Sequence, residues 1–311
     1  MPIGPPDHTA ERIGGKGLPL IVKPKTPDTV RFALPKGRTE DSVRALLADA
    51  GISLRSGPRG YRPIPSVPWL EAKLLKPQNI VEMLAAGTRD VGFAGADWVA
   101  EKQADLVELI DTGLDPVQVV AAAPRDLLDD GVLPDRRLVV ASELTRLTTE
   151  WVTRRGIDAD IIRSYGATEV FPPEDADVIV DISATGETLS EHRLVVIDLV
   201  MDSSTRLYAS REAMADPAKK QTIEGLVLSI RSVLEARTRA MVELNIAVEM
   251  SEALFRILPA MREPTVAPLH GGDALAVKAA VPRSDLPDLI PSLKEAGATD
   301  IVVSRLEQIV P

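Results

Sequence analysis

The feature that most constrains the fold is a regular exchange between short apolar runs and helical patterns between residues 30 and 205. Runs of strand length occur at residues 30–35, 90–95, 117–123, 138–141, 178–182 and 195–200, and helical patterns lie between several of them. Parallel neighbouring strands need a long crossover, which is usually a helix. The alternation therefore predicts an α/β fold with parallel sheets flanked by helices.

The chain is too long for one ordinary domain. Its 311 residues predict two or three packed units. We expect a first α/β lobe at residues 29–115 with a return segment at 205–235, a second lobe at 116–204, and a cleft between them. Each lobe should have its own sheet, so one sheet continuous through residues 30–205 would contradict this division. Residues 1–28 are rich in proline, which favours an irregular N-terminal extension.

The last stretch, residues 238–311, has a different pattern, and an amphipathic helix at 222–235 leads into it. The expected elements are strand 242–250, helix 251–260, strands 265–269 and 274–281, helix 284–296 and strand 300–306. This βαββαβ order is the ferredoxin-like arrangement. A module of this size commonly senses a small ligand, so we expect a separate regulatory domain.

Composition excludes several classes of function. The formal net charge is -10, which argues against nonspecific binding to nucleic acid or to an anionic membrane. Cysteine is absent, so disulfides and thiolate metal sites are excluded. No apolar run is long enough to span a membrane, and the N-terminus does not have the pattern of a secretory signal. We expect a cytoplasmic protein.

The segment at residues 181–189 carries the clearest chemical signal. A buried strand leads into Ser183, Ala184, Thr185 and Gly186, and a helical pattern begins at Glu187 and Thr188. Small residues let backbone N–H groups approach a phosphate, and hydroxyls add further donors. An ordinary strand–helix turn with a threonine cap would have the same sequence pattern, so this segment alone leaves both interpretations open.

The chain resembles the long form of the ATP phosphoribosyltransferases over about residues 30–311. The segment Asp181-Ile182-Ser183-Ala184-Thr185-Gly186-Glu187-Thr188-Leu189 is similar to that family's phosphoribosyl pyrophosphate loop. Further similar pieces occur in the same order as in the family, at residues 34–38, 90–97, 166–170, 202–207, 264–269 and 297–298. The resemblance implies two periplasmic-binding-protein-like α/β lobes that form a catalytic cleft, and a C-terminal ferredoxin-like regulatory domain.

The resemblance also implies the activity. Members of the family join N1 of ATP to the ribose C1 of phosphoribosyl pyrophosphate, release pyrophosphate, and are inhibited by L-histidine. It implies Mg²⁺, bound mainly through the substrate with Asp181 as a candidate ligand, and dimers that assemble into hexamers. The candidate catalytic residues are Lys36, Arg38, Glu169 and Asp181. The candidate substrate-binding residues are Ser183, Ala184, Thr185, Gly186, Glu187, Thr188, Lys76 and Gly95, and the candidate histidine-binding residues are Asn245, Met261, Thr265, Ala280 and Asp300.

Two alternatives remain at this stage. A two-lobed solute-binding protein would have similar local patterns, but it would be expected to carry an export signal. A catalytically silent regulatory subunit, or a relative that acts on another base, is the second alternative. It is motivated by Lys76, which stands where the family has an arginine element, and by a shortened segment at residues 169–177.

Overall fold

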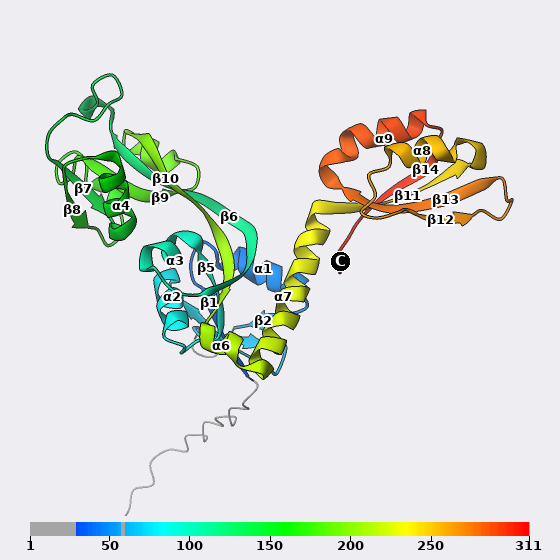
Figure 1. Ribbon diagram of the computed structural model, residues 1–311, viewed down its shortest axis with the longest axis horizontal. Helices are drawn as coiled ribbons and strands as arrows, with labels where there is room; N and C mark the ends of the chain where they lie inside the picture. Colours follow the sequence, from blue (N-terminus) through cyan, green and yellow to red (C-terminus); the bar gives the residue numbers. More distant parts are fainter. Residues whose placement is uncertain (1–28, 57–59, 311) are drawn as a thin grey trace, which may run out of the picture.

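The computed structural model describes residues 29–56 and 60–310, and the predicted extension at residues 1–28 lies outside this range. Figure 1 shows two α/β lobes and a third, smaller domain that helix α7 (Pro217–Thr238) holds apart from them. The α/β class, the two lobes and the separate C-terminal domain are therefore confirmed.

The first lobe is built on three parallel strands, of which β1 (Val30–Pro35) is central and pairs with β4 (Leu70–Leu75) and β5 (Val91–Gly95). Strand β4 is not among the predicted strands. In β4 buried residues alternate with partly exposed ones, and a proline-rich segment precedes the strand, so the sequence shows no continuous apolar run there. The remaining elements of this lobe are α1 (Glu40–Asp49), β2 (Leu54–Arg55), β3 (Ile64–Pro65), α2 (Pro77–Ala85), α3 (Ala96–Lys102) and α6 (Arg211–Ala215).

The second lobe has a similar plan, with β7 (Leu138–Ser142) paired in parallel with both of its neighbours. Its elements are β7, α4 (Thr145–Arg155), β8 (Ala159–Arg163), β9 (Val178–Ser183) and α5 (Glu187–Glu191), with short 3₁₀ helices η1 (Arg125–Leu127) and η2 (Thr168–Val170).

Two long antiparallel strands, β6 (Val107–Pro124) and β10 (Leu194–Ala209), run through both lobes. They join all the lobe strands into one eight-stranded mixed sheet of order β4-β1-β5-β10-β6-β9-β7-β8. The expectation of a separate, parallel sheet in each lobe is therefore wrong. The pairing of β10 with β6 shifts register at several points, and such bulges bend strands, so the lobes remain distinct bodies (Figure 1). Their exact boundaries stay predictions, because β6 and β10 belong to both.

A buried ion pair cluster fixes the first lobe to α7. The Asp90 side chain is 1% exposed and pairs with Arg31 at 2.6 Å and with Lys219 of α7 at 2.9 Å. Burial alone would raise the pKa of Asp90, but the hydrogen bonds from Arg31 and Lys219 together outweigh it and hold that pKa below its usual value. The start of α7 is thus bound to the sheet that carries the cleft.

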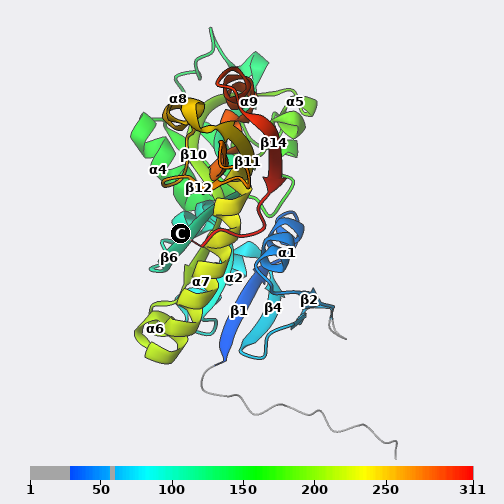
Figure 2. The same cartoon turned by 90° about the vertical axis from the view of Figure 1, so that its right-hand side faces the viewer.

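The C-terminal domain has the predicted βαββαβ order. Its elements are β11 (Arg239–Ala247), η3 (Val248–Met250), α8 (Ser251–Ile257), β12 (Thr265–Pro268), β13 (Ala274–Pro282), η4 (Arg283–Asp285), α9 (Leu286–Glu295) and β14 (Thr299–Arg305). The sheet order β12-β13-β11-β14, with antiparallel pairing, is the ferredoxin-like topology. The chain end then returns along α7 (Figure 2), where the Ile309 N–H donates to the Ser232 carbonyl at 2.9 Å.

Candidate active site

A cavity of about 300 Å³ opens between the lobes, where β1 and β5 end and the long strands pass. Three of the predicted site residues, Lys36, Arg38 and Gly95, line it, while Ile182 of β9 reaches it from the second lobe. The other lining residues are Pro35, Thr39, Pro77, Ala94, Asp97, Trp98, Asp115, Val117, Ser203, Ser204 and Thr205. The cavity therefore combines two cations with carboxylates and hydroxyl groups.

The basic turn follows β1 directly and precedes α1. Its Gly37 has φ +102°, in the left-handed region that glycine tolerates. The Lys36 ammonium donates a hydrogen bond to the Tyr61 hydroxyl at 3.0 Å and lies 4.5 Å from the centre of that ring. This hydrogen bond lowers the pKa of Tyr61. Tyr61 was not predicted as a site residue, because nothing in its proline-rich surroundings indicates a partner 25 residues away.

Gly95 and Asp97 form a close pair on the same wall. A Cβ at Gly95 would lie 2.2 Å from Asp97 Oδ1, so no other residue fits there without displacing the carboxylate. Asp97 is 4% exposed. Its Oδ1 accepts a hydrogen bond from the Trp98 N–H at 2.7 Å, and its own N–H donates to Ser203 Oγ at 3.1 Å. Burial raises the pKa of Asp97, against the effects of Trp98, Ser203 and Arg38.

The predicted phosphate loop has the expected strand–loop–helix form. Strand β9 ends at Ser183, Gly186 has φ +78°, and α5 begins at Glu187. The Thr185 hydroxyl accepts a hydrogen bond from the Glu187 N–H at 3.4 Å. Ala184, Thr185, Glu187 and Thr188 are exposed. None of the residues 183–188 lines the cavity described above, which touches this strand only at Ile182.

Asp181 lies on β9, two residues before the end of the strand. Burial, together with the negative charges of Glu169 and Glu143, raises the pKa of Asp181 to about 6, although the Ile182 N–H donates to Oδ1 at 2.7 Å. Glu169 of η2 and Asp181 are therefore electrostatic neighbours. Glu143 was not predicted, since it sits alone at the end of the β7 segment in the sequence.

Lys76 is exposed and precedes α2. Its neighbour Pro77 lines the cleft cavity, but Lys76 itself does not. The structure thus places Lys76 at the rim rather than inside.

The five candidate histidine-binding residues fall into two groups. Met261, Thr265 and Ala280 line one cavity of about 310 Å³, together with Met241, Ala260, Arg262, Glu263, Lys278, Ala279 and Val310. Asn245 and Asp300 do not line it. They bind each other instead, through a hydrogen bond of 2.9 Å from Asn245 Nδ2 to Asp300 Oδ2. Asn245 is four residues beyond Met241 on β11, which is about 13 Å along a strand.

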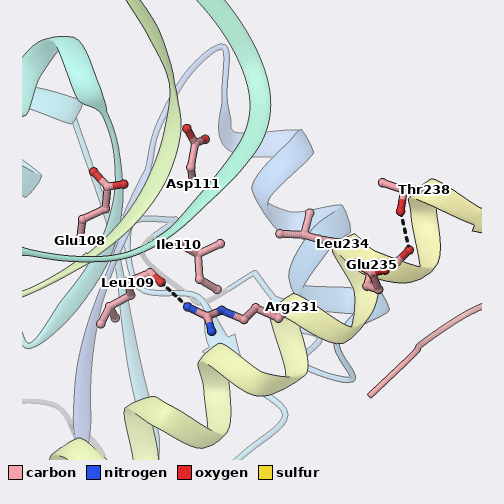
Figure 3. Close-up of a pocket in the computed structure, with 8 residues that line it drawn as sticks. All are labelled: Glu108, Leu109, Ile110, Asp111, Arg231, Leu234, Glu235 and Thr238. Atoms are coloured by element: carbon pink, nitrogen blue, oxygen red, sulfur yellow. Dashed lines mark hydrogen bonds between the residues drawn. The ribbon is translucent and has the colours of Figure 1, made fainter. Parts of the chain in front are cut away.

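A further cavity of about 490 Å³ lies between β6 and α7 (Figure 3). Its walls include Glu108, Asp111 and Glu235, and Arg231 spans it by donating to the Leu109 carbonyl at 3.1 Å. No predicted site residue lies there. It faces the junction between the first lobe and α7, away from the cleft.

Residues 29–56 and 60–310 contain neither a candidate membrane span nor a candidate metal cluster. No helix in these ranges is long and apolar enough to cross a membrane. No group of three or more histidine, cysteine, aspartate or glutamate side chains is arranged to hold a metal ion.

The fold and the cleft define a two-lobed α/β enzyme with cations and hydroxyl groups suited to phosphorylated ligands. The sequence model of the family described as ATP phosphoribosyltransferase matches residues 76–232, and the model of its C-terminal domain matches residues 236–308. The ATP phosphoribosyltransferase of Pelotomaculum thermopropionicum is 34% identical over 287 residues, or 91% of this chain and 99% of the relative. That of Desulforudis audaxviator is 33% identical with the same coverage.

The chain belongs to the ATP phosphoribosyltransferase family, which catalyses the first step of histidine biosynthesis. A solved structure agrees on the fold. The ATP phosphoribosyl transferase (HisG:HisZ) complex from Thermotoga maritima includes a chain with a TM-score of 0.58 and 24% identity. The match covers 65% of this chain and 99% of that one.

Proposed function

We propose that the cleft performs the family reaction with the two elements that face it from opposite lobes. The observation that carries this assignment is the cavity itself, which joins the basic turn of Lys36 and Arg38 to Ile182, the residue directly before the loop at 183–188. Phosphoribosyl pyrophosphate has two separate anionic groups, a 5′-phosphate and a pyrophosphate. One element on each lobe offers a separate site for each group.

The loop at residues 183–188 is assigned to the 5′-phosphate. No atom lies within 4 Å of the position that a Cβ would take at Gly186, which leaves the backbone open to a ligand. Ser183, Thr185 and Thr188 would add hydroxyl donors, while Ala184 and Glu187 would contribute backbone N–H groups.

The basic turn is assigned to the pyrophosphate. As N1 of adenine attacks C1 of the ribose, negative charge grows on the departing pyrophosphate, and the Lys36 and Arg38 side chains would stabilise it. Lys76 at the rim would approach a phosphate as a single ammonium charge, without the paired donors of an arginine. Gly95 lines the same cavity and leaves room for the Asp97 carboxylate, which would lie beside the ligand.

Mg²⁺ fits this arrangement as an ion carried by the substrate. No protein cluster for it exists within the described part of the chain, so Asp181 would be the main carboxylate to meet it. The mutual repulsion of Asp181 with Glu169 and Glu143 is relieved by a cation or by ribose hydroxyl donors. When bound, the ion would neutralise phosphate charge.

We further propose that the C-terminal domain binds L-histidine as a feedback inhibitor. The cavity at Met261, Thr265 and Ala280 also contains Arg262 and Glu263, which are complementary to an amino acid's carboxylate and ammonium groups. The Asn245–Asp300 pair is a second candidate position. A route to the first lobe exists, because Val310 lines the cavity and the preceding Gln308 donates from Nε2 to the Asp49 carbonyl of α1 at 2.9 Å.

We also propose a homo-oligomer, from dimer to hexamer, that acts in the cytoplasm, where both substrates occur. The edge strand β14 supports an assembly role, since Val302 and Val303 are 54% and 42% exposed and an exposed apolar edge favours pairing with another chain.

Gly186→Val tests the loop assignment in an absorbance assay of phosphoribosyl-ATP formation. Valine is strained at φ +78° and would narrow the approach to the backbone, so the KM for phosphoribosyl pyrophosphate should rise by at least about tenfold, the equivalent of one lost phosphate hydrogen bond of ~1.4 kcal/mol.

The matched control is Gly131→Val, since Gly131 also has a positive φ, of +82°, with no neighbour within 4 Å, but lies outside the cleft. An unchanged KM in Gly186→Val, or an equal rise in both variants, rules out the phosphate loop. A wild-type chain that forms no product from the two substrates would favour the silent regulatory subunit.

A further inference from the structure

The cleft cavity contains a buried carboxylate to which the family resemblance assigned no role. Asp97 is 4% exposed and lines the cavity beside Lys36 and Arg38. Its Oδ1 accepts a hydrogen bond from the Trp98 N–H, its backbone N–H donates to Ser203 Oγ, and its carboxylate occupies the space that a side chain at Gly95 would take. A group held this tightly presents its carboxylate in one orientation.

No side chain forms an ion pair with this carboxylate within the described ranges. The charge of Arg38 lowers the pKa of Asp97, but the two side chains are more than 4.0 Å apart. Asp115 of the same cavity already accepts a hydrogen bond from the Ser42 hydroxyl at 2.5 Å. A buried charge without a close partner costs free energy. A ligand group that carries N–H donors or positive charge would offset that cost.

The transfer reaction creates such a charge. The lone pair of adenine N1 forms the bond to C1, while the bond from C1 to the pyrophosphate oxygen breaks and its electrons leave with pyrophosphate. The adenine then carries a positive charge shared by N1, C6 and the 6-amino nitrogen. Negative charge appears on the leaving group at the same time. The cavity presents the Asp97 carboxylate and the cations of Lys36 and Arg38 to these two developing charges.

We propose that Asp97 is the residue that recognises the 6-amino group of ATP and stabilises the positive charge that develops on the adenine. Its carboxylate accepts a hydrogen bond from the amino group, and this bond strengthens as N1 attacks, because the amino hydrogens become more acidic. Purines with a 6-oxo group offer an acceptor at this place and are repelled by the carboxylate. The inference rests on the proposed assignment of the cleft to ATP.

The test uses Asp97→Asn in the full-length chain. Asparagine keeps an oxygen for the Trp98 N–H but replaces the charge with an amide donor. The kcat with ATP should fall on the order of 100-fold, as for other lost transition-state contacts to a charge. The melting temperature and the Kd of phosphoribosyl pyrophosphate with Mg²⁺ should stay at wild-type values. The ratio of the inosine triphosphate Kd to the ATP Kd should fall about tenfold or more, because the amide donates to a 6-oxo group.

The control is Asp105→Asn, since Asp105 is a first-lobe carboxylate that is 76% exposed and pairs with Arg211. It should change none of these quantities. The inference is overturned if Asp97→Asn keeps its kcat with ATP within about threefold of the wild type. It is also overturned if the ratio of the inosine triphosphate Kd to the ATP Kd does not change. A joint loss of melting temperature and of phosphoribosyl pyrophosphate binding would show a structural role instead, and overturns it too.

A second measurement does not depend on the variant's folding. The wild-type enzyme should bind purine riboside triphosphate, which lacks the 6-amino group, about tenfold more weakly than ATP. Equal binding overturns the inference. If the wild type forms phosphoribosyl-ATP and Asp97 proves neutral, only this inference fails. If the wild type forms no product, the proposed function fails first.

Discussion

The cleft and the C-terminal domain each contain a cavity of nearly the same volume, about 300 and 310 Å³, yet they are built differently. The cleft cavity collects charged and hydroxyl side chains from the turn after β1, from α3, β6 and β10, and its carboxylates are buried or hydrogen-bonded. The other cavity is made from the open face of β11 and β13 and the segment before β12, and alanine and methionine form much of its wall.

The difference agrees with the two tasks that we propose for these cavities. A reaction that separates charge needs fixed groups of both signs around the reacting atoms, and only distant segments brought together by two lobes provide them here. Recognition of a small zwitterion needs backbone groups, a few charges and a shape. If this comparison is right, substitutions in the cleft should affect turnover and leave histidine inhibition intact, whereas substitutions in the C-terminal cavity should do the reverse.

The largest expected effect is that of Arg38→Ala and Lys36→Ala on catalysis. Under the proposed assignment each removes a cation that stabilises the departing pyrophosphate, so kcat/KM should fall roughly 100- to 1000-fold. The melting temperature should change little, because both side chains are exposed. Initial rates and thermal unfolding measure the two quantities, and the histidine concentration for half inhibition should remain that of the wild type.

The control for these variants is Arg211→Ala, whose side chain is 62% exposed and lies away from the cleft. If the basic turn has only a structural role, Lys36→Ala and Arg38→Ala should lower the melting temperature and leave the turnover of the folded fraction normal.

A second effect distinguishes carboxylates within the catalytic lobes. The pKa of Asp181 is raised from 3.8 to about 6, first by burial and then by Glu169 and Glu143. A raised carboxylate pKa contributes stability below the unfolded-state pKa, and that contribution is lost as the pH rises through the folded-state pKa. Asp181→Asn should therefore equal the wild type in stability near pH 4 and exceed it above pH 6, by no more than about 3 kcal/mol.

Asp177 provides a control of opposite sign. The hydrogen bond from Arg136 holds the pKa of Asp177 below its usual value, so its contribution is present above the unfolded-state pKa and is lost as the pH falls. Asp177→Asn should be less stable than the wild type at neutral pH, with the difference vanishing in acid. Urea unfolding at pH 4, 6 and 8 measures both variants. A uniform effect of Asp181→Asn across this range would mean that the pKa of Asp181 is not raised in the folded protein.

The elements with uniform apolar runs could be predicted from the sequence, and those with mixed patterns could not. Strands β1 and β9 were found because nearly every side chain in them is apolar. The long strands β6 and β10 were recognised only in their apolar halves, since Asp111, Asp115 and Asp202 interrupt the pattern where the strands cross between the lobes. Missing those halves led to the wrong expectation of two sheets.

The parts of the candidate site that could be predicted are those whose residues are neighbours in the sequence. The strand–loop–helix at 181–188 and the basic turn are contiguous in sequence, so their residue types alone suggested a ligand. Asp97, Tyr61 and Glu143 depend on contacts across many residues, such as that of Asp97 with Ser203, 106 positions away. A single aspartate in a helix start gives no sign of burial, and only the packed structure places it beside Arg38.

The smallest expected effect concerns the C-terminal cavity and decides between its two groups of candidate residues. Thr265 lies on the edge strand β12 and lines the cavity, so its hydroxyl can bond a polar end of histidine. Thr265→Ala should raise the histidine concentration for half inhibition about five- to tenfold, the equivalent of one hydrogen bond of ~1 kcal/mol, and leave kcat unchanged. Asn245→Ala removes the bond to Asp300 and should shift inhibition less, because neither residue lines the cavity.

Coupling requires histidine to favour one global state, so the titration is made against initial rate and not binding alone. A larger shift in Asn245→Ala than in Thr265→Ala would move the site to the Asn245–Asp300 end of the sheet. An intact enzyme indifferent to millimolar histidine would leave the domain with an assembly role only.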